Sequence, residues 1–307
     1  MRRSYLPPLS IVAGMMVLAL SDNFVWMISD LMSVWQYHAL RALIILPGMA
    51  FVIWMLGQAR TIWPQRPLAV FARATFSVAA LMFYFAALPT VGVSLAAAGL
   101  FTSPVFVILI SVIVFRDRVG WHRGLAVVLG FVGVCLVLEI GQTPLRAIAV
   151  APVLGGVFYA LSVIWTRRYC RQETPGCLAF WNMSFFLMVG VAGIAATPWL
   201  AAAIGHIQGT GFATIPLQGV GWRELGIVFG MGIAGAVGMV CLAYGYAGAP
   251  SSYAALFDYS FLLWIPLFAW MLWGETLTWN MFAGMALIIG AGALAIGGLW
   301  QRAVADS

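Results

Sequence analysis

Charged and titratable side chains are scarce in this sequence, and a few of them stand inside long apolar stretches. These are Asp22, His38, Arg41, Arg73 and Asp258, with Glu139 at the end of one stretch. A charge surrounded by apolar groups is costly, so such a residue inside a membrane marks a candidate functional position by default. They are therefore the first residues to consider for chemistry.

One group combines an acid, an aromatic ring and a hydroxyl. Asp22, Trp26 and Ser29 follow each other at steps of four and three, so in a helix they share one face. An amino acid offers an ammonium group, a carboxylate and a side chain, and Asp22 could hold the ammonium group or exchange a proton. The alternative is that Asp22 lies near the outer end of its helix and meets water.

A second group combines a histidine with an arginine. His38 and Arg41 lie three residues apart and share a helix face. The planar guanidinium of Arg41 suits a substrate carboxylate, but a structural ion pair or hydrogen bonds to helix ends would explain it equally. His38 titrates nearest neutral pH, although a lone histidine is commonly a packing residue. We expect Arg73, near a helix end, to extend toward water.

The other acid, Asp258, stands about two turns into an apolar stretch, beside Tyr259. If it faces a central cavity, it is a candidate site for a proton or an amine. The sequence offers it no obvious charged partner.

Enzyme signatures are missing. The sequence has no HExxH, no GxSxG and no Walker A motif, and its three histidines are far apart. The four cysteines lack the spacing of a metal site, and we interpret them as free thiols. We therefore expect no enzymatic activity, no cofactor, no metal and no ATP-driven transport.

The composition indicates which elements must position these residues. The chain is 64% hydrophobic and 8% charged, whereas a soluble domain carries about 25% charged residues. A membrane-spanning helix takes about 20 apolar residues, and we predict ten. Their approximate ranges are 7–29, 33–56, 68–88, 92–115, 121–140, 147–166, 178–200, 222–247, 251–273 and 279–300. Between the seventh and eighth spans we expect a surface loop over residues 201–221.

The basic residues indicate the orientation. All are arginine, and arginine collects in cytoplasmic loops, so the net charge of +6 needs no nucleic acid to explain it. With a cytoplasmic N-terminus, eleven arginines lie at cytoplasmic ends and two, Arg146 and Arg223, at outer ends. We therefore predict a multi-pass inner-membrane protein with both termini in the cytoplasm. Glycines at a spacing of four, as in Gly226 and Gly230, predict close helix packing.

A stretch of the first half returns in the second. Residues 93–121 and 251–279 share an order of small residues, an aromatic residue, an apolar run, an acid and a tryptophan. Phe101 then corresponds to Tyr259, and Asp117 to Glu275. We expect two units, residues 1–145 and 146–307. Because five spans is an odd number, the second unit would enter the membrane from the opposite side.

At this point the sequence resembles a known family, the drug/metabolite transporter superfamily of EamA type. The resemblance rests on Asp22-Asn23-Phe24, Arg41, Pro104 with Asp117, and Gly274-Glu275, in that order. Within the family the chain looks most similar to YddG-type exporters of aromatic amino acids. One departure is Leu262, where the second-half motif would have proline.

The resemblance implies an all-α integral membrane protein with ten transmembrane helices, arranged as two inverted five-helix repeats around a central cavity. It also implies a secondary transporter that exports amino acids, aromatic or hydrophobic ones preferred, by alternating access. Efflux of drugs or other metabolites is the alternative, and an intramembrane lipid-modifying enzyme is a weaker one. The expected partners are amino acids or other amphipathic metabolites and membrane lipid, with no nucleic acid, and a monomer is compatible with the sequence.

The resemblance further implies that aromatic residues of the third, sixth, eighth and ninth spans line the cavity. The expected substrate-binding residues are Asp22, Trp26, His38, Arg41, Tyr84, Ser103, Trp165, Tyr244, Asp258 and Tyr259.

Overall fold

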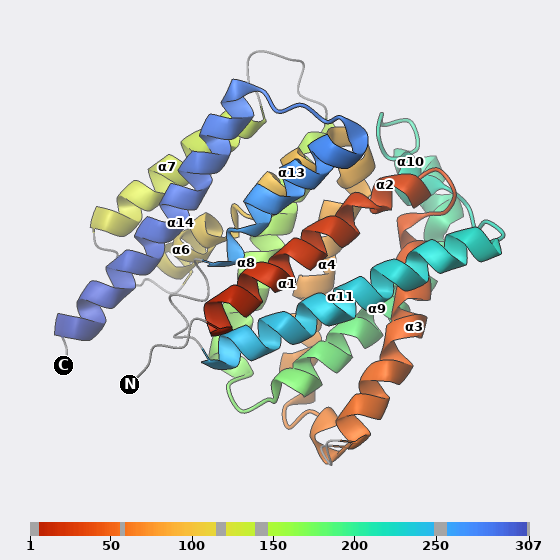
Figure 1. Cartoon of the computed structure of the whole chain (residues 1–307), viewed down its shortest axis with the longest axis horizontal. Coiled ribbons are helices and arrows are strands. Elements are labelled where there is room, and N and C mark those ends of the chain that lie inside the picture. The colour runs from red at the N-terminus through yellow and green to blue at the C-terminus, as the bar shows by residue number, and fades with distance from the viewer. Residues whose placement is uncertain (1–5, 56–58, 115–120, 139–146, 249–256, 306–307) are drawn as a thin grey trace.

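The computed structural model describes residues 6–55, 59–114, 121–138, 147–248 and 257–305. Every regular element in these ranges is a helix, as predicted (Figure 1). The α-helices are α1 (Leu6–Asn23), α2 (Val25–Ile28), α3 (Val34–Met55), α4 (Pro67–Val91), α5 (Val93–Leu100), α6 (Ser103–Ile113), α7 (Trp121–Val137), α8 (Ala151–Tyr169), α9 (Pro175–Ile204), α10 (Gly211–Thr214), α11 (Trp222–Gly248), α13 (Phe261–Trp273) and α14 (Trp279–Ala305). Two short 3₁₀ helices, η1 (Ala59–Ile62) and η2 (Ala147–Val150), precede α4 and α8.

The helices follow the predicted spans. In the described ranges, seven helical segments are long and apolar enough to cross a membrane, and shorter apolar helices cover 124–137, 261–273 and 279–294. The shorter ones coincide with the fifth, ninth and tenth predicted spans. Hydropathy therefore identified the elements correctly. Glu139 and Asp117 lie outside the described residues.

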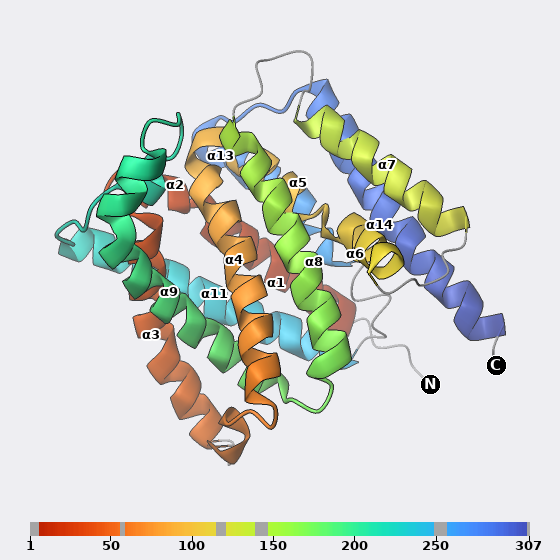
Figure 2. The ribbon, with the colours of Figure 1, turned by 180° about the vertical axis from the view of Figure 1, so that it is seen from behind.

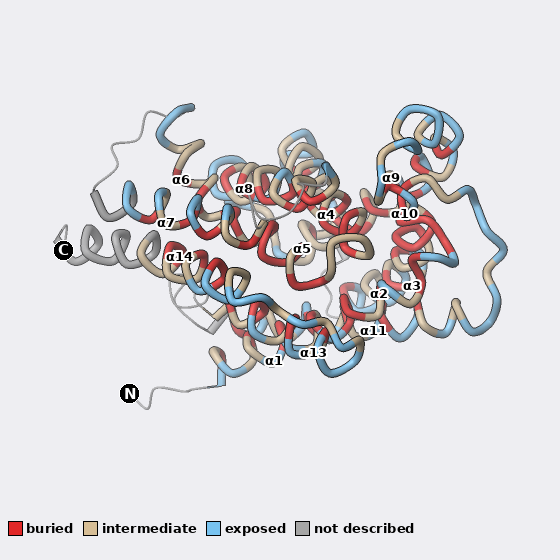
Figure 3. The backbone as a smooth tube through the Cα atoms, turned by 90° about the horizontal axis from the view of Figure 1, so that it is seen from above, coloured by how far each residue is buried: buried red, intermediate tan, exposed pale blue. Residues whose placement is uncertain are grey.

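The closest helix pairs all join a helix before residue 146 to a helix after it. These pairs are α1 with α11, α3 with α9, α4 with α8, and α7 with α14, and α5 also packs against α13. Figures 1 and 2 show α7 and α14 side by side at one end of the molecule, and α3 and α9 near the other. Buried residues of α4, α5 and α8 lie on the sides that face the middle of the molecule (Figure 3).

Glycine allows two of these crossings. A Cβ on Gly133 of α7 would lie 2.8 Å from the carbonyl oxygen of Gly284 on α14, and one on Gly14 of α1 would lie 2.9 Å from that of Gly238 on α11. Both distances are too short for a side chain, so the backbones touch directly. The prediction for Gly226 was wrong in this respect, because a Cβ there would meet open space.

Two spans are interrupted at corresponding positions. The fourth span breaks at Phe101 and Thr102, between α5 and α6, just before Pro104. Proline lacks an N–H and clashes with the carbonyl four residues earlier, which explains that break. The ninth span turns at Tyr259 and Ser260, before α13. That break occurs with Leu262 in the proline's place, so proline is not what specifies it.

The acidic turn after α13 caps a helix of the other half. The carboxylate oxygens of Glu275 accept hydrogen bonds from the backbone N–H groups of Val93 and Ser94, each at 3.3 Å. These N–H groups begin α5 and have no partner within the helix, and a negative charge at a helix N-terminus is favourable. Glu275 therefore holds the start of α5 against the loop before α14.

The segment predicted as a surface loop is partly buried. Helix α9 continues to Ile204, and Phe212 of α10 is only 4% exposed. The indole N–H of Trp35 donates to the carbonyl of Ala213 at 2.8 Å, and Gln36 exchanges two hydrogen bonds with the backbone of Gln218. These contacts from α3 fix the segment against the helices.

Candidate functional site

The helical framework buries an acid at the centre of a polar cluster. Asp22 near the end of α1 is 8% exposed, and one of its carboxylate oxygens, Oδ2, accepts a hydrogen bond from the Tyr84 hydroxyl at 3.0 Å. Tyr84 lies on α4 and is 1% exposed. Both residues were candidates from the sequence, but they are 62 positions apart and nothing in the sequence connected them. The structure joins them. The alternative in which Asp22 meets water at the end of its helix does not apply.

Arg41 supplies the opposite charge. Its guanidinium donates from Nη1 to the Tyr37 hydroxyl at 3.3 Å, and its charge acts electrostatically on Asp22. The two side chains form no direct ion pair, although both lie in the described part of the chain. The Asp22 carboxylate and the Arg41 guanidinium therefore lie in the same interior region without forming an ion pair.

His38 completes the cluster as an aromatic residue. Its ring stacks on Phe186 of α9 with 4.8 Å between centroids, and it meets Phe85 of α4 edge-on at 4.7 Å. His38 is 2% exposed, and its Nε2 has no hydrogen-bond partner among the described residues. The packing alternative therefore describes most of its contacts, while one nitrogen stays available.

Room for Arg41 comes from a glycine. A Cβ built on Gly235 of α11 would collide with the Nη2 atom of Arg41. The same helix has open space at Gly230. Gly235 is thus a residue of the site that composition alone did not single out, since α11 contains several glycines.

Asn23 is a further residue that sequence reasoning did not assign to the site. Its side-chain amide donates to the carbonyls of Ala19 at 2.9 Å and Ile265 at 3.2 Å, and the Trp273 indole donates to its backbone carbonyl at 3.1 Å. Ile265 and Trp273 belong to α13. Asn23 therefore fastens the end of α1 to a helix of the second half, directly beside Asp22. A buried asparagine next to an intramembrane acid was the available signal.

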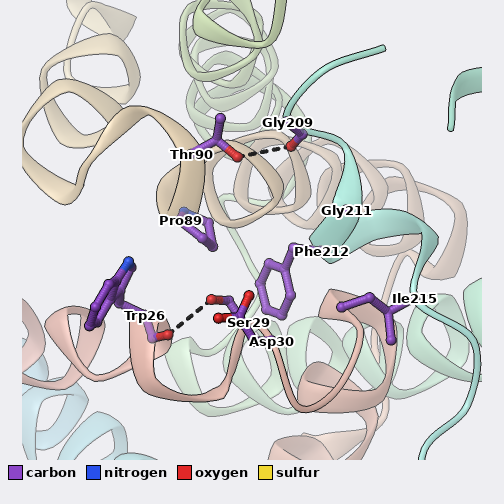
Figure 4. Close-up of a pocket in the computed structure, with 9 residues that line it drawn as sticks. All are labelled: Trp26, Ser29, Asp30, Pro89, Thr90, Gly209, Gly211, Phe212 and Ile215. Atoms are coloured by element: carbon purple, nitrogen blue, oxygen red, sulfur yellow. Dashed lines mark hydrogen bonds between the residues drawn. The ribbon is translucent and has the colours of Figure 1, made fainter. Parts of the chain in front are cut away.

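A pocket opens next to this cluster (Figure 4). It has a volume of about 310 Å³. Its lining comes from the α1–α2 end of the first span, the end of α4, and the segment around α10. The lining residues are Trp26, Ser29, Asp30, Pro89, Thr90, Gly209, Gly211, Phe212 and Ile215.

The pocket and the buried acid lie between the same elements. Tyr84, which binds Asp22, precedes Pro89 by five residues on α4, which is about 7.5 Å along a helix. Trp26 and Ser29 line the pocket, while Asp22 lies deeper, because the first span is interrupted between Asn23 and Val25. The helix face that Asp22, Trp26 and Ser29 were expected to share is therefore divided: Trp26 and Ser29 line the pocket, and Asp22 is buried beneath it.

The remaining predicted residues lie elsewhere. Trp165 contacts Tyr169 near the end of α8, with 4.5 Å between centroids and 44° between the ring planes, and its buried indole N–H has no partner among the described residues. Tyr244 on α11 is 56% exposed. Ser103 is 8% exposed, at the start of α6. The structure does not bring these three to the Asp22 cluster, and their substrate contacts stay predictions.

Asp258 and Tyr259 occupy the break in the ninth span. Asp258 is half-buried, and its charge acts on the hydroxyls of Tyr159 and Tyr259. Tyr259 is 5% exposed, and its hydroxyl lacks a partner among the described residues. A Cβ on Gly292 of α14 would collide with that hydroxyl, so the glycine makes space for the ring.

Arg73 does not extend to water as expected. Its Nη1 donates to the side-chain oxygen of Asn182 at 3.0 Å and to the carbonyl of Leu178 at 3.4 Å, both on α9. The half-buried arginine therefore ties α4 to α9.

Within the described residues, no group of three or more histidine, cysteine or acidic side chains could hold a metal ion.

Comparison with known proteins supplies a family. The model of the EamA-like transporter family matches residues 6–139 and again residues 146–297. A riboflavin transporter of Rhizobium johnstonii is 28% identical over 236 residues, which are 77% of this chain and 71% of that protein. An uncharacterized transporter of Helicobacter pylori is 26% identical, over 66% of this chain and 65% of its own length.

Two further proteins are similar. A riboflavin transporter of Brucella anthropi is 28% identical over 190 residues, so the match spans 62% of each chain. One solved crystal structure matches over 94% of this chain and 96% of its own, with a TM-score of 0.58 and 17% sequence identity. At that identity the likeness concerns the fold.

Proposed function

Because the chain belongs to the EamA-like transporter family, we propose that it exports amino acids, with aromatic or hydrophobic side chains preferred. The family makes it a membrane transporter. The substrate class and the direction are our proposal.

The observation that carries this proposal is the pairing of Asp22 and Arg41 in one buried cluster. An amino acid at neutral pH carries an ammonium group and a carboxylate, and each needs a partner once it leaves water. Asp22 offers a carboxylate held by Tyr84, and Arg41 offers a guanidinium held by Tyr37. Since the two form no direct ion pair, each charge is left for the opposite charge of a zwitterionic substrate. The aromatic rings of His38, Phe85 and Phe186 suit an apolar side chain.

The helix pairing supports transport by two inverted halves. If each span corresponds to the one five positions later, exchange of the halves turns the α1–α11 pair into the α8–α4 pair. It leaves the α3–α9, α5–α13 and α7–α14 pairs unchanged. The contacts are therefore those of a pseudo-two-fold arrangement, in which rocking of one half against the other alternates access to a site between them.

The arginine distribution supports an inner-membrane protein with both termini in the cytoplasm. In this orientation the pocket at Trp26 and Asp30 opens on the outer face, and the α8–α9 turn, with Arg167, Arg168 and Arg171, faces the cytoplasm. Export would then run from the turn toward the pocket.

The experiment is counterflow in proteoliposomes with labelled Phe, Trp, Thr and Met, with and without a pH gradient. We expect saturable exchange of Phe and Trp. Exchange without a gradient would support facilitated export, and exchange only with a gradient would support proton coupling. No flux of any amino acid would overturn the substrate proposal.

Riboflavin or a similar heteroaromatic compound is the second candidate, because two of the similar proteins are named riboflavin transporters. Riboflavin is uncharged at neutral pH and does not need the Asp22 and Arg41 charges. Labelled riboflavin belongs in the same assay. Flux of riboflavin alone, insensitive to Asp22→Asn, would favour this candidate over amino acids.

A further inference from the structure

The outer pocket has a distribution of polar groups that points to one kind of ligand. Its apolar lining includes Trp26, Pro89 and Phe212, and its polar lining includes Ser29, Asp30 and Thr90. In Figure 4 the oxygen atoms of Ser29 and Asp30 lie between the Trp26 and Phe212 rings.

The two hydroxyl groups of the pocket already use their hydrogens. Ser29 Oγ donates to the backbone carbonyl of Trp26 at 2.9 Å, and Thr90 Oγ1 donates to the carbonyl of Gly209 at 3.0 Å. Asp30 is exposed, and within the described part of the chain its carboxylate makes no hydrogen bond or ion pair. Asp30 is therefore the charge that a ligand would meet, and no basic residue lines the pocket.

Of the two aromatic side chains of the pocket, Trp26 is the exposed one. Trp26 is 52% exposed, although part of its ring packs on Trp273 with 5.0 Å between centroids. Phe212 is held at the opposite wall because α10 is fastened to α3 by the Trp35 bond to Ala213. The wall is thus in place before any ligand arrives.

From these observations we propose that the pocket is a binding site for an organic cation that carries an aromatic ring, distinct from the Asp22 cluster. The ammonium group of such a ligand pairs with Asp30 and is attracted to the face of the Trp26 ring. Its own ring packs against Trp26, with Phe212 at the opposite wall. A volume of about 310 Å³ suits a compound of one or two rings, at the small end of ligand pockets. An organic anion would face an unneutralised carboxylate.

The test is calorimetric titration of tryptamine into the purified full-length protein in nanodiscs. We expect saturable binding that Asp30→Asn weakens about fivefold, the upper range for a solvent-exposed ion pair. Trp26→Leu should weaken binding about threefold through loss of the cation–π contact. Indole-3-propionate, which has the same ring system with a negative charge, should bind more weakly than tryptamine.

Matched controls come from the start of α11. Glu224→Gln removes an acid and Trp222→Leu removes an exposed tryptophan, both outside the pocket lining, and neither should change tryptamine binding. Because Trp26 also packs on Trp273, the melting temperature of each variant is measured. If Trp26→Leu fails to fold, the result for Asp30→Asn decides the test.

Several results would overturn the proposal. These are no saturable tryptamine binding, equal weakening by Asp30→Asn and Glu224→Gln, or equal affinity for indole-3-propionate. Loss of tryptamine binding in Asp22→Asn with none in Asp30→Asn would also overturn it. Binding is measured without transport, so a failure here leaves the export proposal intact, and absent amino-acid flux with normal tryptamine binding would overturn export alone.

Discussion

The rings of Phe101 and Tyr259 lie against each other, with 5.8 Å between their centroids and 56° between their planes. The two residues are 158 positions apart in the chain, and each stands at the interruption of its own span. Phe101 also stacks on Phe261 at 5.4 Å. Corresponding residues of two repeats can meet in this way only near the axis that relates the repeats. The contact therefore marks where the two broken spans cross.

This contact should be measurable as coupling between the two residues. We expect Phe101→Ala and Tyr259→Ala each to destabilise the protein, and the double variant to lose less than their sum. The coupling should be about 0.5–1.5 kcal/mol, as for other aromatic pairs. Melting of the four forms in detergent checks it. Strictly additive losses would show that the rings do not stabilise each other.

Asp22→Asn should reduce amino-acid exchange at least tenfold, since a hydrogen bond to a charged group contributes about 1.5–3 kcal/mol. Asparagine keeps an oxygen that can accept from Tyr84, so the melting temperature should change little. Counterflow in proteoliposomes measures the first effect. Glu224→Gln is the control for loss of an acid elsewhere, and equal exchange by both variants would contradict a substrate role for Asp22.

Tyr84→Phe should lower stability without removing a charge. The Asp22 carboxylate would stay buried without its hydrogen-bond donor, which costs about 1–3 kcal/mol. Thermal melting in detergent measures the loss. Phe85→Leu, which alters the neighbouring ring but leaves the bond to Asp22, separates packing from hydrogen bonding. A Tyr84→Phe protein as stable as the parent would mean that water replaces the hydroxyl.

Gly235→Ala tests the space around Arg41. The added methyl group would collide with the guanidinium and displace it from the cluster, so amino-acid exchange should fall several-fold. Gly230→Ala is the matched control, because it adds the same group on the same helix where there is open space. If both variants exchange amino acids at the parental rate, Arg41 does not need its present position.

Asn23→Ala removes the side-chain hydrogen bond that fastens α1 to α13 at Ile265. We expect a loss of about 0.5–1.5 kcal/mol, the net contribution of one hydrogen bond, because Ile265 lies inside α13 and its carbonyl keeps its helical partner. Thr75→Ala removes an exposed side chain that bonds only to its own helix, at the Phe71 carbonyl, and should have little effect. Similar melting temperatures for the two variants would remove Asn23 as a structural tie.

The sequence by itself determined the elements of this protein. The helical type and approximate positions of the membrane spans follow from hydropathy, because a span of about 20 apolar residues is a local property of the chain. The sequence also identified Asp22 and Arg41 as exceptional, since a charge in an apolar stretch is visible without any contact. Pro104 indicated the break in the fourth span for a similarly local reason.

Only the tertiary structure decided which side chains meet. These helices are apolar on most sides, so their sequences do not indicate which face turns inward. Tyr84 and Tyr244 look equivalent in the sequence, yet Tyr84 is buried against Asp22 and Tyr244 is exposed. Gly235 and Gly230 differ only by the presence of Arg41 on a neighbouring helix. Helix rotation and crossing set these contacts, and both depend on the packing of the whole chain.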